Sequence, residues 1–147
     1  MNGLLLQFDG GAPSTGGDGG FGAVLCWPDG EVMEQLYGYL GSNVNHHICE
    51  YCGLIYGVRL AREYAPATLR IIGDSMMVVK QVTGEHRVRG DHLAVLHAAA
   101  VAELAALPGT WTIEHTKRTG NKAADKLATR ARTAKTPTFA VPGGVHV

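Results

Sequence analysis

The sequence has no excess of charge of either sign, because 13 Lys and Arg residues balance 13 Asp and Glu residues among 147. A neutral chain lacks the strong positive field that draws nucleic acids to many of their binding proteins, so affinity for such a ligand must come from local groups. Long apolar runs are also missing, and no stretch approaches the roughly 20 consecutive apolar residues that a membrane-spanning helix needs. We therefore expect no membrane partner.

Cysteine is scarce as well. The three cysteines, Cys26, Cys49 and Cys52, form an odd and sparse set, unlike the disulfide framework of a small secreted protein. The chain starts Met1-Asn2-Gly3 and leads straight into a strand-like run, without the charged and apolar regions of a signal peptide. These features predict a cytoplasmic protein.

A cluster of histidine and cysteine suggests one alternative, a zinc-binding structural module. His46, Cys49 and Cys52 follow one another at three-residue spacing, with His47 beside them. Zinc sites with a Cys-x-x-Cys pair usually need a second pair of ligands, and Cys26 alone remains. On a helix, positions three and six residues apart also drift around the surface and fit a tetrahedral ion poorly. We therefore rank zinc binding below the interpretation developed next.

Apolar residues are abundant, at 46% of the chain, which is enough for the core of one domain. We assign residues 1–134 to this domain. Residues 135–147 contain Pro137, Pro142 and a Gly-Gly pair, which predicts a flexible C-terminal tail.

Periodicity and turn residues predict an order of elements typical of an α/β domain. We expect strands over 3–9, 21–28, 31–39, 69–74 and 110–115, and helices over 45–63, 75–83, 92–107 and 121–134. The first three strands follow one another directly and should pair antiparallel, whereas the later strands are separated by helices. The prediction is a mixed five-stranded sheet with helices on both faces.

Two of these strands end in an acidic residue, Asp9 and Asp74. If the strands are parallel neighbours, their backbones lie about 4.8 Å apart at the edge of the sheet where sites gather. Glu50, on the buried stripe of the first helix, and Asp125, near the start of the last helix, can reach the same edge. The alternative is that each acid is a helix cap or a surface charge, as Asp74 would be at the start of the next helix.

Carboxylates that converge in this way repel one another unless a cation lies between them. Oxygen ligands suit Mg²⁺ or Mn²⁺ better than zinc. Two such ions about 3.5–4 Å apart can activate a water and stabilise the leaving oxygen of a phosphodiester. The four acids therefore predict two Mg²⁺ or Mn²⁺ ions per active site and phosphodiester chemistry.

Four short motifs stand in order along the chain. They are Phe-Asp-Gly-Gly-Ala at 8–12 with Gly-Phe-Gly at 20–22, Cys-Glu-Tyr at 49–51 with glycines at 53 and 57, Gly-Asp-Ser at 73–75 with a glycine at 84, and Arg-Thr-Gly-Asn-Lys-Ala-Ala-Asp-Lys-Leu-Ala at 118–128. Each motif alone is weak, but four in this order are specific. Over roughly residues 4–132 the chain resembles type 1 ribonuclease H.

The resemblance implies a ribonuclease H-like fold and a two-metal endoribonuclease that hydrolyses the RNA strand of RNA/DNA hybrids. The products would carry 5′-phosphate and 3′-hydroxyl ends. Asp9 and Asp74 would be the principal metal ligands in the catalytic centre. Glu50 would bind one metal and contact the substrate ribose, and Asp125 would complete the second metal site.

Contacts with the substrate are also implied by the resemblance. Backbone groups at Gly10 and Gly11 would sense the RNA 2′-hydroxyl, which separates RNA from DNA. Where the family usually has Thr-Asn-Asn, this chain has Asn45-His46-His47, whose side chains can still form hydrogen bonds with RNA. Arg118 is a candidate phosphate contact.

Two further residues allow two interpretations each. Asn121 is either a first-turn cap of the last helix or a group that positions Asp125 or binds a phosphate. His115 either packs at the end of its strand or helps proton transfer. The other basic residues expected to meet phosphates, with modest and salt-sensitive binding, are Lys80, Arg87, Arg89, Lys117 and Lys122.

A different function on the same fold is the main alternative. Fold alone does not determine function, so the chain could act on double-stranded RNA or DNA junctions, or bind nucleic acid without cutting it. Either way we expect a monomer.

Overall fold

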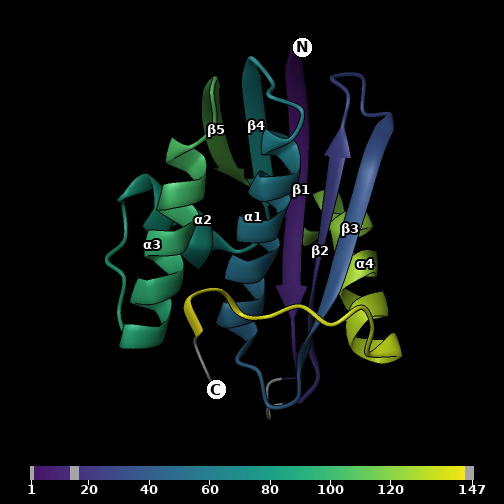
Figure 1. Cartoon of the computed structure of the whole chain (residues 1–147), viewed down its shortest axis with the longest axis vertical. Coiled ribbons are helices and arrows are strands. Elements are labelled where there is room, and N and C mark those ends of the chain that lie inside the picture. The colour runs from purple at the N-terminus through teal and green to yellow at the C-terminus, as the bar shows by residue number, and fades with distance from the viewer. Residues whose placement is uncertain (1, 14–16, 145–147) are drawn as a thin grey trace.

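A computed structural model describes residues 2–13 and 17–144 and contains a five-stranded sheet in the order β3-β2-β1-β4-β5 (Figure 1). The strands are β1 (Gly3–Gly11), β2 (Gly19–Cys26), β3 (Val32–Gly41), β4 (Thr68–Gly73) and β5 (Thr110–His115). The first three pair antiparallel, whereas β4 pairs parallel with both β1 and β5. The predicted mixed sheet is confirmed.

Helices cover both faces of this sheet, as expected. They are α1 (His46–Arg62), α2 (Met76–Thr83), α3 (Asp91–Ala105) and α4 (Lys122–Ala134), with short 3₁₀ turns at Arg118–Gly120 and Pro142–Gly144. Helix α1 packs on β1 and β2 with α3 beside it, and α4 packs on the opposite face against β1, β2 and β3 (Figure 1). Across the described residues, no helix is long and apolar enough to cross a membrane.

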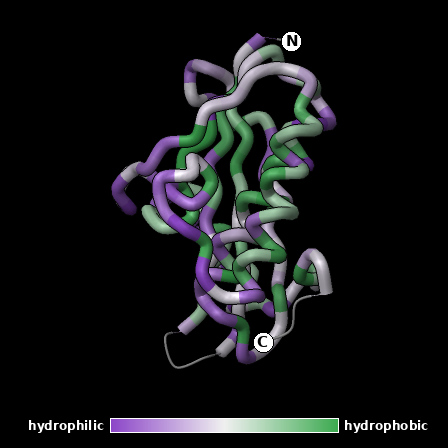
Figure 2. Tube along the Cα trace, turned by 90° about the vertical axis from the view of Figure 1, so that its left-hand side faces the viewer, coloured by the Kyte–Doolittle hydropathy of each residue, from purple (hydrophilic) through white to green (hydrophobic). Residues whose placement is uncertain are grey.

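The core lies between the sheet and the helices, where Figure 2 shows the hydrophobic stretches of the chain gathered. Strand β2 is buried along its whole length, as a central strand covered on both faces should be. On α4 the buried positions are Ala124, Leu127, Ala128 and Ala131. On α3 the buried positions are Leu96, Ala100 and Leu104, and Leu93 is partly buried.

The segment after α4, which we expect to be a flexible tail, contacts the rest of the fold in its described part. Tyr39 of β3 donates a backbone hydrogen bond to Pro137 (2.7 Å) and accepts one from Phe139 (2.8 Å). The Phe139 ring packs against Phe21 and Tyr56 with centroids about 5 Å apart. The chain then continues to α3 (Figure 1). Residues 145–147 lie outside the described residues, and the flexibility of the segment stays a prediction.

Strand β1 and helix α1 touch backbone to backbone, which is why glycines occur at the contact. A Cβ on Gly53 would lie 2.4 Å from the Asp9 carbonyl oxygen, and one on Gly10 would lie 2.0 Å from the Cys49 carbonyl oxygen. Any larger residue would push the helix away from the strand. This close approach places Glu50 beside the end of β1.

Gly10→Ala should therefore lower the free energy of unfolding by about 1–3 kcal/mol, because the added methyl group overlaps α1 backbone atoms. Gly11→Ala is the matched control, since a Cβ there meets nothing within 4 Å. Urea denaturation of both variants measures the difference. Equal stabilities would contradict the proposed contact between β1 and α1.

Candidate active site

One pocket of about 450 Å³ at the carboxyl end of β1 and β4 collects the four predicted acids. The predicted residues that line it are Asp9, Gly10, Gly11, His46, His47, Glu50, Asp74, Arg118 and Asp125. The acids come from β1, α1, the loop after β4 and the first turn of α4. Segments distant in the sequence therefore meet at one edge of the sheet.

Strand register brings Asp9 and Asp74 together. Phe8 of β1 is paired in parallel with Gly73 of β4, so the next residue of each strand reaches the pocket at the same level. Ser75, not Asp74, caps α2, because its hydroxyl oxygen accepts a hydrogen bond from the Val78 backbone N–H (3.2 Å). The alternative that Asp74 is the helix cap is wrong.

Asp9 is the most perturbed acid of the site. Its side chain is buried, with 7% of the residue exposed. Burial, reinforced by the negative charge of Asp74 and by Asp125, raises the pKa of Asp9 from 3.8 to about 8, against a smaller opposing effect of a hydrogen bond from the Gly10 backbone. At neutral pH and without a cation, Asp9 thus holds a proton.

Glu50 is buried on α1 and faces two histidines of the preceding turn. Its carboxylate lies 3.4 Å from His46 Nε2 and 3.1 Å from His47 Nδ1. The hydrogen bond to Glu50 is the main cause of a raised pKa at His46. Both imidazoles are partly exposed at the pocket rim, where each makes a polar contact with the Glu50 carboxylate.

Asn121 lies below the pocket and does not line it. The residue is fully buried, and its Nδ2 donates a hydrogen bond to the Phe8 carbonyl oxygen (2.8 Å). Asn121 occupies the N-cap position of α4, where its backbone carbonyl oxygen accepts a hydrogen bond from the Asp125 N–H (3.1 Å), but its side chain makes no capping hydrogen bond. Asn121 instead connects the start of α4, which carries Asp125, to the strand that carries Asp9.

Asn121→Ala should lower the free energy of unfolding by about 1–3 kcal/mol, because the buried Phe8 carbonyl loses its partner. Lys122→Ala is a suitable control, since this neighbouring side chain is exposed and its removal should change stability by less than about 0.5 kcal/mol. Thermal and urea unfolding measure both. A stability of Asn121→Ala equal to that of the control would contradict the role of this hydrogen bond.

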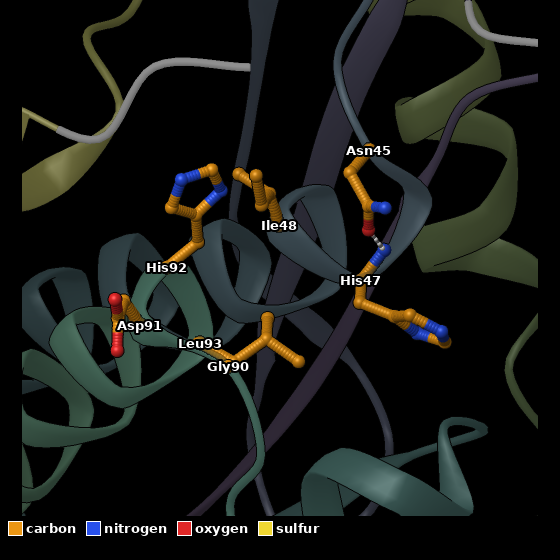
Figure 3. Close-up of a pocket in the computed structure, with 7 residues that line it drawn as sticks. All are labelled: Asn45, His47, Ile48, Gly90, Asp91, His92 and Leu93. Carbon is orange, nitrogen blue, oxygen red and sulfur yellow. Dashed lines mark hydrogen bonds between the residues drawn. The ribbon is translucent and has the colours of Figure 1, made fainter.

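Two further predicted residues, besides Asn121, lie outside the acidic pocket. Asn45 caps α1, with its Oδ1 accepting from the His47 backbone N–H (2.8 Å). Asn45 lines a neighbouring pocket of about 530 Å³ together with Gly90 and His92 (Figure 3). His47 lines both this pocket and the acidic one. His115 is exposed at the end of β5, paired with Gly73, and is not among the residues that line the acids.

Two cations border the acids. Arg118, an expected residue, places its Nε 3.8 Å from the Asp74 carboxylate and is largely exposed. Arg132 also lines the pocket, although the sequence analysis did not select it. The signal that could have found it is its spacing, because Arg132 follows Asp125 by two helical turns and shares its face.

The donor set fits hard divalent cations. Four carboxylates border the pocket, and burial together with the charge of Asp74 raises the pKa of Asp9, so a cation bound there would stabilise its ionised form. Within the described chain, no group of three His, Cys, Asp or Glu side chains is already placed to hold a metal ion. The carboxylates would therefore have to turn toward an ion in order to bind it. Cys26, Cys49 and Cys52 are buried and unpaired in the core.

Comparison with known proteins settles the family. Residues 7–131 match the family model described as reverse transcriptase-like. The chain belongs to the reverse transcriptase-like family. Within it, the chain is 31% identical over 132 residues to the "Bifunctional protein Rv2228c" of Mycobacterium tuberculosis, covering 89% of this chain and 36% of that protein. It is also 31% identical to "Ribonuclease HI" of Halobacterium salinarum, covering 84% of this chain and 61% of that protein.

Solved structures confirm the ribonuclease H fold. The N-terminal RNase H domain of Rv2228c superposes with a TM-score of 0.84 at 28% identity, covering 90% of this chain and 94% of that one. RNase H1 of Halobacterium salinarum gives 0.84 at 27% identity, covering 90% and 98%. LC11-RNase H1 in complex with an RNA/DNA hybrid also gives 0.84, over 90% and 98%, and at 21% identity its likeness shows the fold alone.

Proposed function

We propose that this member of the reverse transcriptase-like family is a metal-dependent endoribonuclease that hydrolyses the RNA strand of RNA/DNA hybrids. The observation that carries the proposal is the convergence of Asp9, Glu50, Asp74 and Asp125 in one pocket. Among the relatives, the Halobacterium salinarum protein supports the proposal, because it is named "Ribonuclease HI". The chain spans 61% of the length of that protein. The products would carry 5′-phosphate and 3′-hydroxyl ends.

Four side chains would hold two Mg²⁺ or Mn²⁺ ions. Asp9 and Asp74 would be the principal ligands, and Asp9 would give up its proton as the first ion binds. Glu50 would bind one ion and contact the ribose, after release from His46 and His47, while Asp125 would complete the second site. When bound, such a pair of ions supplies activation of water and stabilisation of the leaving oxygen.

Recognition of the substrate would use groups around the acids. The backbone at Gly10 and Gly11 lies on the pocket wall, where it would meet the RNA 2′-hydroxyl. Arg118 is exposed next to Asp74 and would bind a phosphate. His46 and His47, freed from Glu50, would donate hydrogen bonds to the RNA strand.

Other nucleic-acid structures are the alternative substrates. A uniformly labelled RNA/DNA hybrid, double-stranded RNA, double-stranded DNA and a DNA junction should be incubated with Mg²⁺ or Mn²⁺. We expect internal cuts in the RNA of the hybrid, abolished by a chelator, and products whose 5′ ends are phosphorylated. Preferential cutting of another substrate, or no cutting of any, would contradict the proposal. Zinc retained by protein purified without added metal would favour the zinc-binding alternative.

A further inference from the structure

Helix α4 runs alongside the paired strands β1 and β2. Asp9 of β1 is paired with Gly22 of β2, and a Cβ on Gly22 would lie 2.5 Å from the Ala124 carbonyl oxygen. The first turn of α4 therefore contacts the paired strands β1 and β2 at the level of Asp9. This contact is what brings Asp125 to the acids.

The last turns of α4 contact the same pair of strands two residues further along β1. Gly11 is paired with Gly20, and a Cβ on Gly20 would lie 2.9 Å from the Arg132 backbone nitrogen. Two residues of a strand advance by about 6.6 Å. The last turns of α4 thus place the backbone of Arg132 at the level of Gly11, which is two residues beyond Asp9 at the C-terminal end of β1.

Arg132 is among the residues that line the acidic pocket, as are Gly11 and Ala12. It is partly buried, and its charge offsets a small part of the effect of burial, which raises the pKa of the Cys49 thiol to about 12. Among the described residues, no Asp or Glu oxygen lies within 4.0 Å of its guanidinium, whereas Arg118 and Lys135 each have an acidic partner. Arg132 is thus a cation without a counter-ion at the entrance to a nuclease-like site.

Partial burial of a cation without a partner costs free energy, which the binding of a negatively charged ligand can offset. A guanidinium binds phosphate oxygens through two parallel N–H groups, and in a chain of zero net charge such local groups must supply the affinity. Arg132 follows Asp125 by seven residues, about 10.5 Å along α4, and helical side chains point back toward the N-terminal end of their helix, so its guanidinium can reach the phosphate next to the one at the carboxylates. We propose that Arg132 binds the phosphate next to the one at the carboxylates, an inference that rests on the proposed function for the identity of the strand.

The test compares Arg132→Gln and Arg132→Lys with Arg130→Gln. Arg130 is a matched control because it lies on the same helix but over the Tyr37 ring, 5.0 Å from its centroid, outside the pocket. Steady-state cleavage of a hybrid gives KM and kcat. Hybrid binding over a series of salt concentrations, on an Asp74→Asn background that prevents turnover, gives the dissociation constant and its salt dependence.

Arg132→Gln should raise KM and the dissociation constant about tenfold at low salt, with kcat changed by less than about twofold. The slope of log affinity against log salt should become shallower by about 0.9, the value of one phosphate contact. Arg132→Lys should keep the slope but lose affinity severalfold, because an ammonium cannot form the paired contact. Arg130→Gln should match the parent in every measurement.

The outcomes separate this inference from the proposed function. Hybrid cleavage with KM and slope unchanged in Arg132→Gln would overturn the inference and leave the function standing. No cleavage, but nucleic-acid binding whose slope depends on Arg132, would support the inference and overturn the function. Neither cleavage nor binding by the parent would overturn both. If Arg132→Gln does not fold, Arg132→Lys decides, since unchanged affinity in that variant contradicts a paired phosphate contact.

Discussion

Asp9→Asn and Asp74→Asn are each expected to lower the rate of RNA/DNA hybrid cleavage by a factor on the order of 10³ or more. Each change replaces a carboxylate at the carboxyl end of β1 or β4 by a neutral amide of the same shape, so the proposed divalent ions would lose a charged ligand. A correctly held ion contributes several kcal/mol to stabilising charge in the transition state, and about 1.4 kcal/mol is a factor of ten in rate. The measurement is single-turnover cleavage at saturating Mg²⁺ or Mn²⁺.

The control for these variants is Asp29→Asn. Asp29 lies in the exposed turn between β2 and β3, where its Oδ1 accepts a hydrogen bond from the Glu31 backbone, and an asparagine oxygen can accept the same bond. Cleavage by this control should equal that of the parent. Rates of Asp9→Asn or Asp74→Asn within a few-fold of the control would contradict the two-metal proposal, provided circular dichroism shows that the variants are folded.

The metal-free protein is expected to lose stability as the pH rises from about 4 to about 8. Asp9 has a pKa of about 8 in the folded protein against 3.8 for an ordinary aspartate, so between these values the folded state holds a proton that the unfolded state has released. Stability falls with pH wherever the folded state binds more protons. The loss is at most about 6 kcal/mol, since the shift from 3.8 to about 8 is about four pKa units and each unit corresponds to about 1.4 kcal/mol.

His46 contributes to the same trend. Its pKa is raised, chiefly by the hydrogen bond to Glu50, so the stability that it adds is complete below its unfolded pKa of 6.5 and is lost as the pH rises. Asp9→Asn should remove most of the pH dependence and leave the smaller part due to His46. Urea unfolding between pH 4 and pH 9, in a chelator, measures both proteins.

Added Mn²⁺ should reverse the loss, because the ion binds the ionised acids of the folded state only. At a concentration about 100 times its dissociation constant, a ligand of the folded state adds about 2.7 kcal/mol. The melting temperature should therefore rise by several degrees in millimolar Mn²⁺, and more at pH 8 than at pH 5. A metal-free stability that increases between pH 5 and pH 8, or an unchanged melting temperature with Mn²⁺, would contradict the burial of a repelling acid cluster.

Much of this arrangement could be predicted from the sequence because local signals are strong where strands end. Asp9 and Asp74 each follow an apolar run, and parallel pairing of two such strands is sufficient to bring them together. Helical periodicity placed Glu50 on the buried face of α1, where the structure has it. These inferences needed only the period of each element and the order of the elements.

Other features depend on contacts that no local pattern encodes. The hydrogen bond of Asn121 joins it to Phe8, 113 residues away, so the sequence alone left the choice between cap and positioning group open. Arg132 reaches the pocket because α4 lies along the β1–β2 ladder, a geometry determined by tertiary packing. The contact of residues 137–142 with β3 could not be predicted from the sequence either. A proline-containing stretch without periodicity gives no indication of which strand it pairs with.

The contact of that stretch with β3 has a practical consequence for how the protein can be shortened. A chain cut at Ala134 would expose the backbone groups of Tyr39 that now pair with Pro137 and Phe139, together with the rings of Phe21 and Tyr56. A bare strand edge next to uncovered aromatic rings is a template for pairing between molecules. Recombinant versions should therefore extend at least through the buried Pro142, because aggregation would otherwise obscure any assay of nuclease activity.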